Sequence, residues 1–146
     1  MKLKCIGLTI MATLMSLSAH AQSSAPAQSS GQQQRVMDYC NAMRTPLLVA
    51  GTQYVSLWAS NTAPDDARTQ IYKSVHDSVQ YQKANALMRT TMDKVVSDIA
   101  DPEGLKAHTN AMMQHGEKYL GLIGFSWANK TTDSFYAWCN YNRLSV

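Results

Sequence analysis

Two cysteines, Cys40 and Cys139, stand near the two ends of the apolar part of the chain, and they restrict its fold more than any other residues do. A disulfide needs Cα atoms within about 7 Å of each other, so a bond between them would bring the start and the end of the domain together. Redox pairs usually lie two residues apart, and these two do not. We therefore predict one structural disulfide, which also requires an oxidising compartment.

The first 21 residues have the pattern of a secretory signal peptide. Lys2 and Lys4 precede the 13-residue uncharged stretch Cys5–Leu17, and Ala19-His20-Ala21 supplies the small residues of a cleavage site. Thirteen residues are fewer than the roughly 20 that span a bilayer as a helix, so a membrane anchor is the less favoured alternative. We expect cleavage after Ala21, loss of Cys5 and export to the periplasm or beyond.

Residues 22–34 (QSSAPAQSSGQQQ) contain no large apolar side chain and are predicted to be a flexible leader. Residues 35–146 are then a single helical domain. Loss of Lys2 and Lys4 leaves 11 of the 13 basic residues against ten acidic ones, a net charge of +1. Because no cluster of Lys and Arg occurs, we expect no nucleic-acid partner.

The spacing of apolar residues predicts a helix from about Gln33 to Ser60. Pro46 interrupts it, so a kink or a restart is expected there, with Thr45 as the cap. The apolar residues follow each other at intervals of four and three: Val36, Cys40, Met43, Leu47, Ala50, Tyr54 and Leu57.

A second helix is expected to begin in the segment 61–66, where a proline is followed by acidic residues, and to continue to about Ala100. Its polar middle predicts a break near Gln82. Asp101-Pro102 begins a third helix, which we expect to end at Gly121 or Gly124. Residues 125–131 would then form a loop, and a short fourth helix would run from Thr132 or Asp133 to Tyr141.

No segment has the alternation and turns of a β-hairpin, so the fold class is all-α. We predict an antiparallel, up-and-down bundle of about four helices closed by one disulfide. An even number of alternating helices places the start of the first and the end of the last at the same end of the bundle, where Cys40 and Cys139 could meet.

His76-Asp77 is one candidate for chemistry, because a histidine beside a carboxylate can act as a general base. With Tyr81, this pair resembles secreted phospholipase A2, which implies a histidine-dependent esterase. That family has cysteines beside the pair and a glycine-rich calcium loop, and this chain has neither. The alternative is a solvated polar stretch of helix.

His108, Met112 and His115 lie at i, i+4 and i+7, on one side of a helix. Imidazole and thioether groups suit copper, or a haem held between helices. Ordinary core packing explains the same spacing, and we expect no cofactor and no metal.

Six aromatic residues fall within 17 positions, and they are the candidate partner-binding residues: Phe125, Trp127, Phe135, Tyr136, Trp138 and Tyr141. Packing inside the bundle accounts for part of this cluster, and a surface that anchors a partner accounts for the rest. We expect no catalytic residues, since no nucleophile elbow, phosphate loop or carboxylate pair occurs.

The expected function is that of an exported, non-enzymatic helical protein that binds a protein of the cell envelope in the periplasm. An inhibitor or immunity protein against a secreted toxin or wall hydrolase is one form of this hypothesis. The alternatives are a chaperone or adaptor of envelope proteins, and a metal-binding, haem-binding or histidine-dependent hydrolytic protein. A homodimer, formed through the apolar stripe of the first helix, is also considered.

Overall fold

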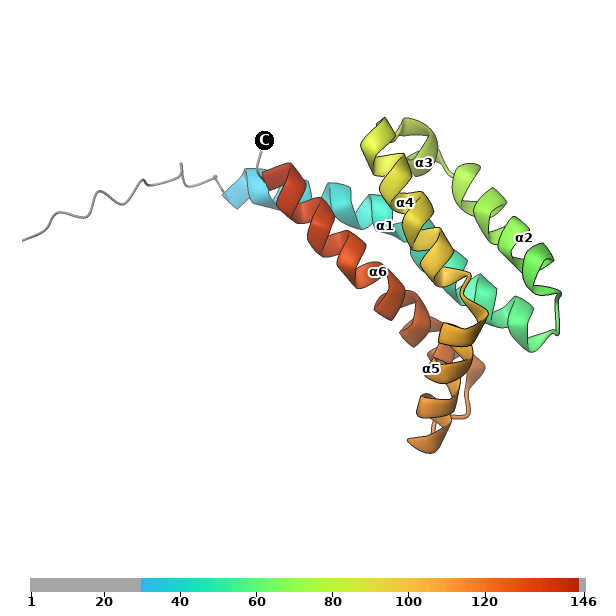
Figure 1. The fold of residues 1–146 in the computed structure, drawn as a ribbon. Helices are drawn as coiled ribbons and strands as arrows, with labels where there is room; N and C mark the ends of the chain where they lie inside the picture. Colours follow the sequence, from blue (N-terminus) through green and yellow to red (C-terminus); the bar gives the residue numbers. More distant parts are fainter. Residues whose placement is uncertain (1–29, 145–146) are drawn as a thin grey trace, which may run out of the picture.

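The computed structural model describes residues 30–144, and all regular structure within that range is helical (Figure 1). The all-α prediction is therefore confirmed, with six helices where about four were expected. The helices are α1 (Ser30–Ala59), α2 (Pro64–His76), α3 (Val79–Lys83), α4 (Ala86–Ile99), α5 (Pro102–Gln114) and α6 (Leu120–Leu144).

The predicted signal peptide and residues 22–29 of the predicted leader lie outside the described residues. Ser30–Gln34, the remainder of that leader, form the exposed first turn of α1. No helix of the described residues is both long and apolar enough to cross a membrane.

The long helices α1 and α6 pack side by side in opposite directions (Figure 1). The predicted disulfide joins Cys40 of α1 to Cys139 of α6, with their Cα atoms 5.8 Å apart. Further along α1, Gly51 lies against Ala128, an earlier residue of α6, which establishes the antiparallel direction.

The helix α1 is unbroken at Pro46, contrary to the predicted kink or restart. Thr45 does not cap a new helix, because its hydroxyl donates to the carbonyl of Asn41, one turn earlier. Proline removes a helical amide, but Pro46 is buried between the fully buried Cys40 and Leu47. Pro46 itself therefore contributes apolar surface to the core.

The predicted second helix is divided into α2, α3 and α4, which confirms a break in its polar middle. Ser78 Oγ accepts a hydrogen bond from the Tyr81 amide at 3.2 Å and so caps α3. Asn85 Oδ1 accepts from the Met88 amide at 2.8 Å and caps α4 in the same way. These two caps satisfy amides that a continuous helix would bond internally.

The predicted start of α5 is confirmed, since Asp101 Oδ1 accepts from the Glu103 amide at 3.1 Å. Its predicted end at Gly121 or Gly124 is wrong: α5 ends at Gln114, and Gly116 adopts a φ of 89° just beyond it. Glycine takes this left-handed conformation without a steric penalty.

The segment 125–131 is helical rather than a loop, because α6 already begins at Leu120. Gly124 does not stop this helix. A Cβ on Gly124 would lie 3.6 Å from Thr52 Cα and from Val55 Cβ, so this glycine packs closely on α1. Where α6 begins, α5 extends away from the other helices (Figure 1).

Candidate functional site

The six predicted aromatic residues do not share one surface. Trp127 and Phe135 are 3% and 1% exposed, so these two belong to the core and cannot present their rings to a partner. Tyr136 and Trp138 are half-buried against the core. Only the remaining two are well exposed, and they lie at opposite ends of α6: Phe125 near its start and Tyr141 near its end.

Trp127 of α6 contacts both α4 and α5. Its indole Nε1 donates to the Ile99 carbonyl at 3.1 Å, at the end of α4. His108 of α5 packs on the same ring, with the ring centroids 5.5 Å apart. The role of Trp127 is therefore to position α5.

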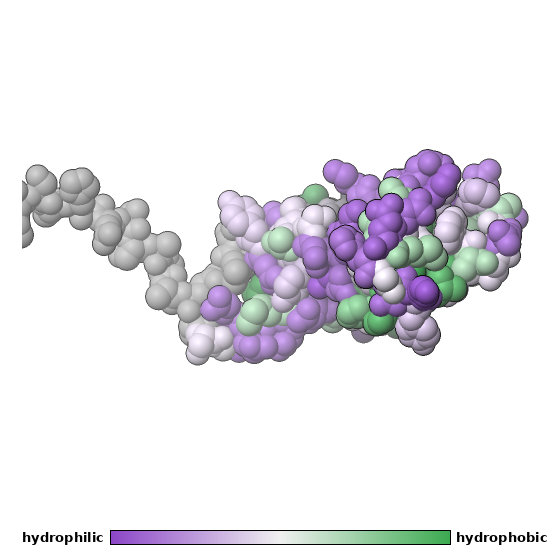
Figure 2. Space-filling view, turned by 90° about the horizontal axis from the view of Figure 1, so that it is seen from below, coloured by the Kyte–Doolittle hydropathy of each residue, from purple (hydrophilic) through white to green (hydrophobic). Residues whose placement is uncertain are grey.

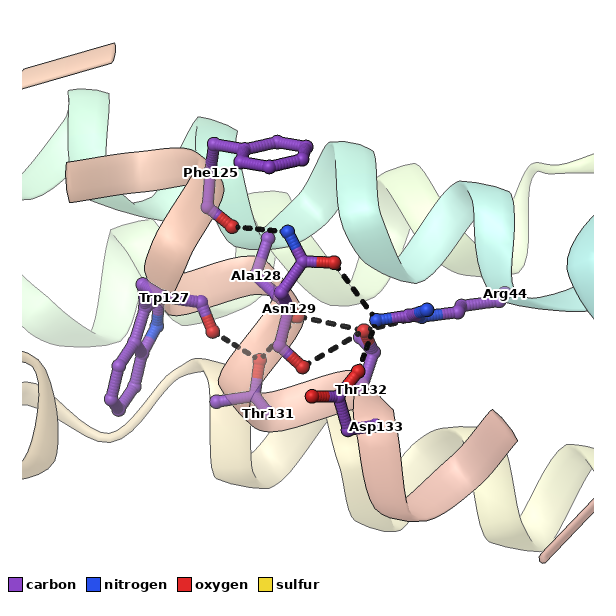
Figure 3. Close-up of polar contacts among 8 residues, drawn as sticks. All are labelled: Arg44, Phe125, Trp127, Ala128, Asn129, Thr131, Thr132 and Asp133. Carbon is purple, nitrogen blue, oxygen red and sulfur yellow. Dashed lines mark hydrogen bonds and ion pairs between the residues drawn. The ribbon is translucent and has the colours of Figure 1, made fainter. Parts of the chain in front are cut away.

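Arg44 of α1 is engaged by α6 and is almost enclosed, with 14% of its side chain exposed (Figure 3). Its guanidinium donates to Thr132 Oγ1 at 2.8 Å, to Asn129 Oδ1 at 2.9 Å and to Asp133 Oδ1 at 2.6 Å. It also lies over the Tyr136 ring, 5.5 Å from the ring centroid. With its donors directed to these acceptors, Arg44 serves as a bridge between helices rather than as an open anion site.

His76 and Asp77 do not form the pair that their sequence suggested. The Asp77 carboxylate accepts from Lys73 Nζ, one turn earlier on α2. The partner of His76 is instead Asp93 of α4, with 2.7 Å between Nε2 and Oδ1. An ionised carboxylate only accepts hydrogen bonds, so Nε2 of His76 is the donor in this pair.

Two tyrosines complete this cluster. Tyr81 donates its hydroxyl to Asp93 Oδ2 at 3.0 Å and stacks on His76, with ring centroids 4.3 Å apart. Tyr72 donates to the Asp93 backbone carbonyl at 3.3 Å. Partial burial and the hydrogen bond to Asp93 raise the pKa of Tyr81. About two-fifths of the His76 and Asp93 side chains remain exposed, at 41% and 37%.

His108, Met112 and His115 are not assembled into a ligand set. His108 Nε2 is buried and has no hydrogen-bond partner among the described residues. Met112 packs against the core, while His115 is exposed beyond the end of α5. Between residues 30 and 144, no group of three or more His, Cys, Asp or Glu side chains is placed to hold a metal ion.

Large apolar side chains are exposed around the connection from α5 to α6. We call this set the apolar corner; on the face of the molecule seen in Figure 2, apolar residues lie in patches among hydrophilic ones. Its members and their exposed fractions are Met113 50%, Tyr119 69%, Leu120 44%, Leu122 50% and Phe125 60%. The sequence had singled out only Phe125 of these five.

A pocket lies at the opposite end of α4 and α6, beside the disulfide, and we call it the disulfide-end pocket. Its volume is about 470 Å³. It is formed where α4 begins and α6 ends, against the first turns of α1, and its lining residues are Val36, Asn85, Leu87, Met88, Trp138, Cys139 and Asn142.

No protein-family model, no curated protein and no solved structure matches this chain. Function must therefore be inferred from the apolar corner, the His76–Asp93 pair and the disulfide-end pocket.

Proposed function

We propose that this chain is an exported, non-enzymatic protein that binds a protein partner in the periplasm through its apolar corner. The observation that supports this is the exposure of five large apolar side chains within the 13 residues from Met113 to Phe125. Exposed apolar side chains that together form one contiguous surface often mark an interaction site. Aromatic side chains such as Phe125 and Tyr119 are typical anchors of protein interfaces.

Export is supported by the disulfide, since such bonds persist in oxidising compartments. Within this proposal, an inhibitor or immunity protein against a toxin or wall hydrolase is the preferred form, and a chaperone or adaptor is the alternative. As part of the same proposal, α1, α2, α4 and α6 form the up-and-down four-helix bundle, with α3 and α5 as additions to it.

The test compares variants that differ only in where an apolar side chain is removed. Residues 22–146 would be immobilised as wild type, Phe125→Ser, Leu122→Ser and Val79→Ser, and used to capture proteins from an envelope extract. Val79 is the matched control, because it is 60% exposed, as Phe125 is, but lies on α3 outside the corner.

We expect one envelope protein to be retained in stoichiometric amount by the wild type and by Val79→Ser, and at least tenfold less by the two corner variants. Calorimetry with the purified partner would then give the same order of affinities. Equal capture by all four proteins, or light scattering that shows only a homodimer through the corner, would overturn the proposal.

A second candidate function, a histidine-dependent hydrolase, is favoured by the 2.7 Å pair of His76 and Asp93. An imidazole oriented by a carboxylate can act as a general base toward water, and general acid–base catalysis typically contributes a factor of about 10²–10⁴ in rate. The test is hydrolysis of p-nitrophenyl butyrate by the wild type, His76→Gln and the exposed control His115→Gln. Loss of activity in His76→Gln but not in His115→Gln supports an enzyme. Hydrolysis by the wild type that is no faster than in buffer alone rejects it.

A further inference from the structure

The disulfide-end pocket is separate from the apolar corner, since the two lie at opposite ends of α4 and α6. Its volume of about 470 Å³ falls in the range of roughly 300–1,000 Å³ that is typical of small-molecule sites. An inference about this pocket does not rest on the function proposed above.

The wall of the pocket is apolar and in part fixed covalently. Cys139 is held to α1 by the disulfide, and Met88 is 3% exposed, so neither wall residue is free to move into the space. Trp138 adds a half-buried indole ring. Leu87 stands at the rim, 61% exposed. An apolar molecule would therefore meet apolar surface on several sides, which favours transfer from water.

Two asparagines supply the polar groups, and each uses one half of its amide within its own helix. Asn85 Oδ1 accepts from the Met88 amide at 2.8 Å, which leaves the Asn85 NH₂ group as a donor. Asn142 Nδ2 donates to the Trp138 carbonyl at 2.9 Å, which leaves Asn142 Oδ1 as an acceptor. One N–H of Asn142 also remains unused, so the pocket offers N–H donors and a carbonyl acceptor, and a ligand group that can both accept and donate would satisfy both kinds.

Among the lining residues that the structure describes, none carries a charge, since Cys139 is oxidised and the others are neutral. The next hollow along α4 and α6 is different, because Lys94 and Asp98 line it. Trp138 lines both hollows and marks the limit of the uncharged one. A charged ligand would lose its hydration in the disulfide-end pocket without gaining an ion pair, so an uncharged ligand is favoured.

The geometry points to a binding site for one small, uncharged molecule that has an apolar body and a single amide or hydroxyl group. The apolar body occupies the space between Leu87, Met88 and Trp138. The polar group accepts from Asn85 and donates to Asn142.

The probe for this site is phenylacetamide, and phenylacetate is its charged counterpart of nearly the same shape. Each would be titrated into ¹⁵N-labelled protein of residues 22–146, with amide chemical shifts as the readout. We expect phenylacetamide to shift the amides of the pocket residues with saturation, and phenylacetate to bind at least tenfold more weakly. Equal binding of the two probes, or shifts located elsewhere on the protein, would overturn the inference.

A variant with a matched control tests the role of the amide. Asn142→Ala removes the free acceptor and should weaken phenylacetamide binding about fivefold or more, whereas Asn41→Ala, an exposed position on α1 outside the pocket, should not. Thermal unfolding would verify that both variants are folded. The absence of any saturable shift in the wild type would mean that the pocket is closed in the whole chain, and would also reject the proposal.

Discussion

Gly51 of α1 lies so close to Ala128 of α6 that a Cβ atom on Gly51 would stand 2.7 Å from both Cα and Cβ of Ala128. One of these two atoms belongs to the backbone, so no change of rotamer could relieve the contact. The two helices can approach this closely only because residue 51 has no side chain. This contact lies between the disulfide and the point where Gly124 packs on Thr52, in the middle of the antiparallel pair.

We predict that Gly51→Ala destabilises the protein, although alanine is the better helix former by roughly 1 kcal/mol. Overpacking in a core typically costs about 1–3 kcal/mol, so after the helix-propensity gain we expect a net loss of up to about 2 kcal/mol in the free energy of unfolding, measured by urea denaturation. Gly31→Ala is the control, because no atom lies within 4 Å of its added Cβ. If Gly51→Ala proves as stable as that control, the close contact does not limit helix packing.

The disulfide should make a large contribution to stability, because it closes a loop with a sequence separation of 99 residues. The chain-entropy account gives up to about 4–5 kcal/mol for such a loop. We expect Cys40→Ala/Cys139→Ala to lose a large part of this amount in urea denaturation. Unfolding of the wild type in the presence of dithiothreitol should give the same midpoint as the double variant. Identical midpoints for the oxidised wild type and the double variant would contradict the prediction.

Much of the fold could be predicted from local patterns. Five of the seven residues of the predicted α1 stripe are buried and the other two, Val36 and Leu57, are partly buried; the α4 residues Met88, Met92, Val95 and Ile99 are buried. Cysteine pairing was predictable because only two cysteines remain after the predicted cleavage. In each case, one local property determines the result, either helical spacing or the default chemistry of a thiol pair.

The extent of α6 could not be predicted in the same way. Its buried stripe has helical spacing (Gly124, Ala128, Thr132, Phe135 and Cys139), but Gly124 and Thr132 are residues that hydropathy does not mark as core. Small residues are needed there because α1 approaches so closely. Gly121 and Gly124 were predicted to end a helix, whereas Gly124 instead provides room for the neighbouring helix α1.

The His76–Asp93 pair also could not be predicted from local sequence patterns. The two residues are 17 positions apart and meet only because α3 turns the chain between α2 and α4. The neighbouring Asp77 was the obvious partner in sequence, but adjacent helical residues point in different directions. Only the tertiary arrangement selects Asp93.

Arg44 should contribute through geometry as well as charge. Its three hydrogen bonds to α6 require the planar fork of a guanidinium, so Arg44→Lys cannot reproduce them. We expect Arg44→Lys and Arg44→Met to lose about 1–2 kcal/mol each. The loss stays moderate because the partners keep other bonds: Thr132 donates to the Ala128 carbonyl, and Asn129 to the Phe125 carbonyl.

The matched control for Arg44 is Asp133→Asn, which removes the charge of the partner but keeps an acceptor. The Asp133 side chain is 70% exposed, so its ion pair is screened by solvent, and we expect a change below about 1 kcal/mol. Urea denaturation of Arg44→Lys, Arg44→Met and Asp133→Asn in one buffer would distinguish a geometric contribution from a charge contribution. A larger loss in Asp133→Asn than in Arg44→Lys would show that charge, rather than geometry, dominates.

His108 should make stability depend on pH in the mildly acidic range. Partial burial of the ring, and secondarily the charge of Lys130, lower the pKa of His108 from its ordinary value of 6.5. The folded protein therefore resists protonation of this ring more than the unfolded chain does. Stability is fully present above about pH 6.5 and is lost as the pH falls through the lowered value, because the unfolded chain takes up the proton first.

We expect the wild type to lose more unfolding free energy than His108→Leu between about pH 7.5 and pH 5, with urea midpoints as the measurement. His115→Gln should follow the wild type, because His115 is exposed and makes no packing contact of the kind that His108 makes with Trp127. All other titrating groups are common to the wild type and His108→Leu, so the difference between these two proteins isolates His108. If His108→Leu loses as much stability as the wild type, the buried ring is not the group that senses acid, even though its Nε2 has no hydrogen-bond partner among the described residues.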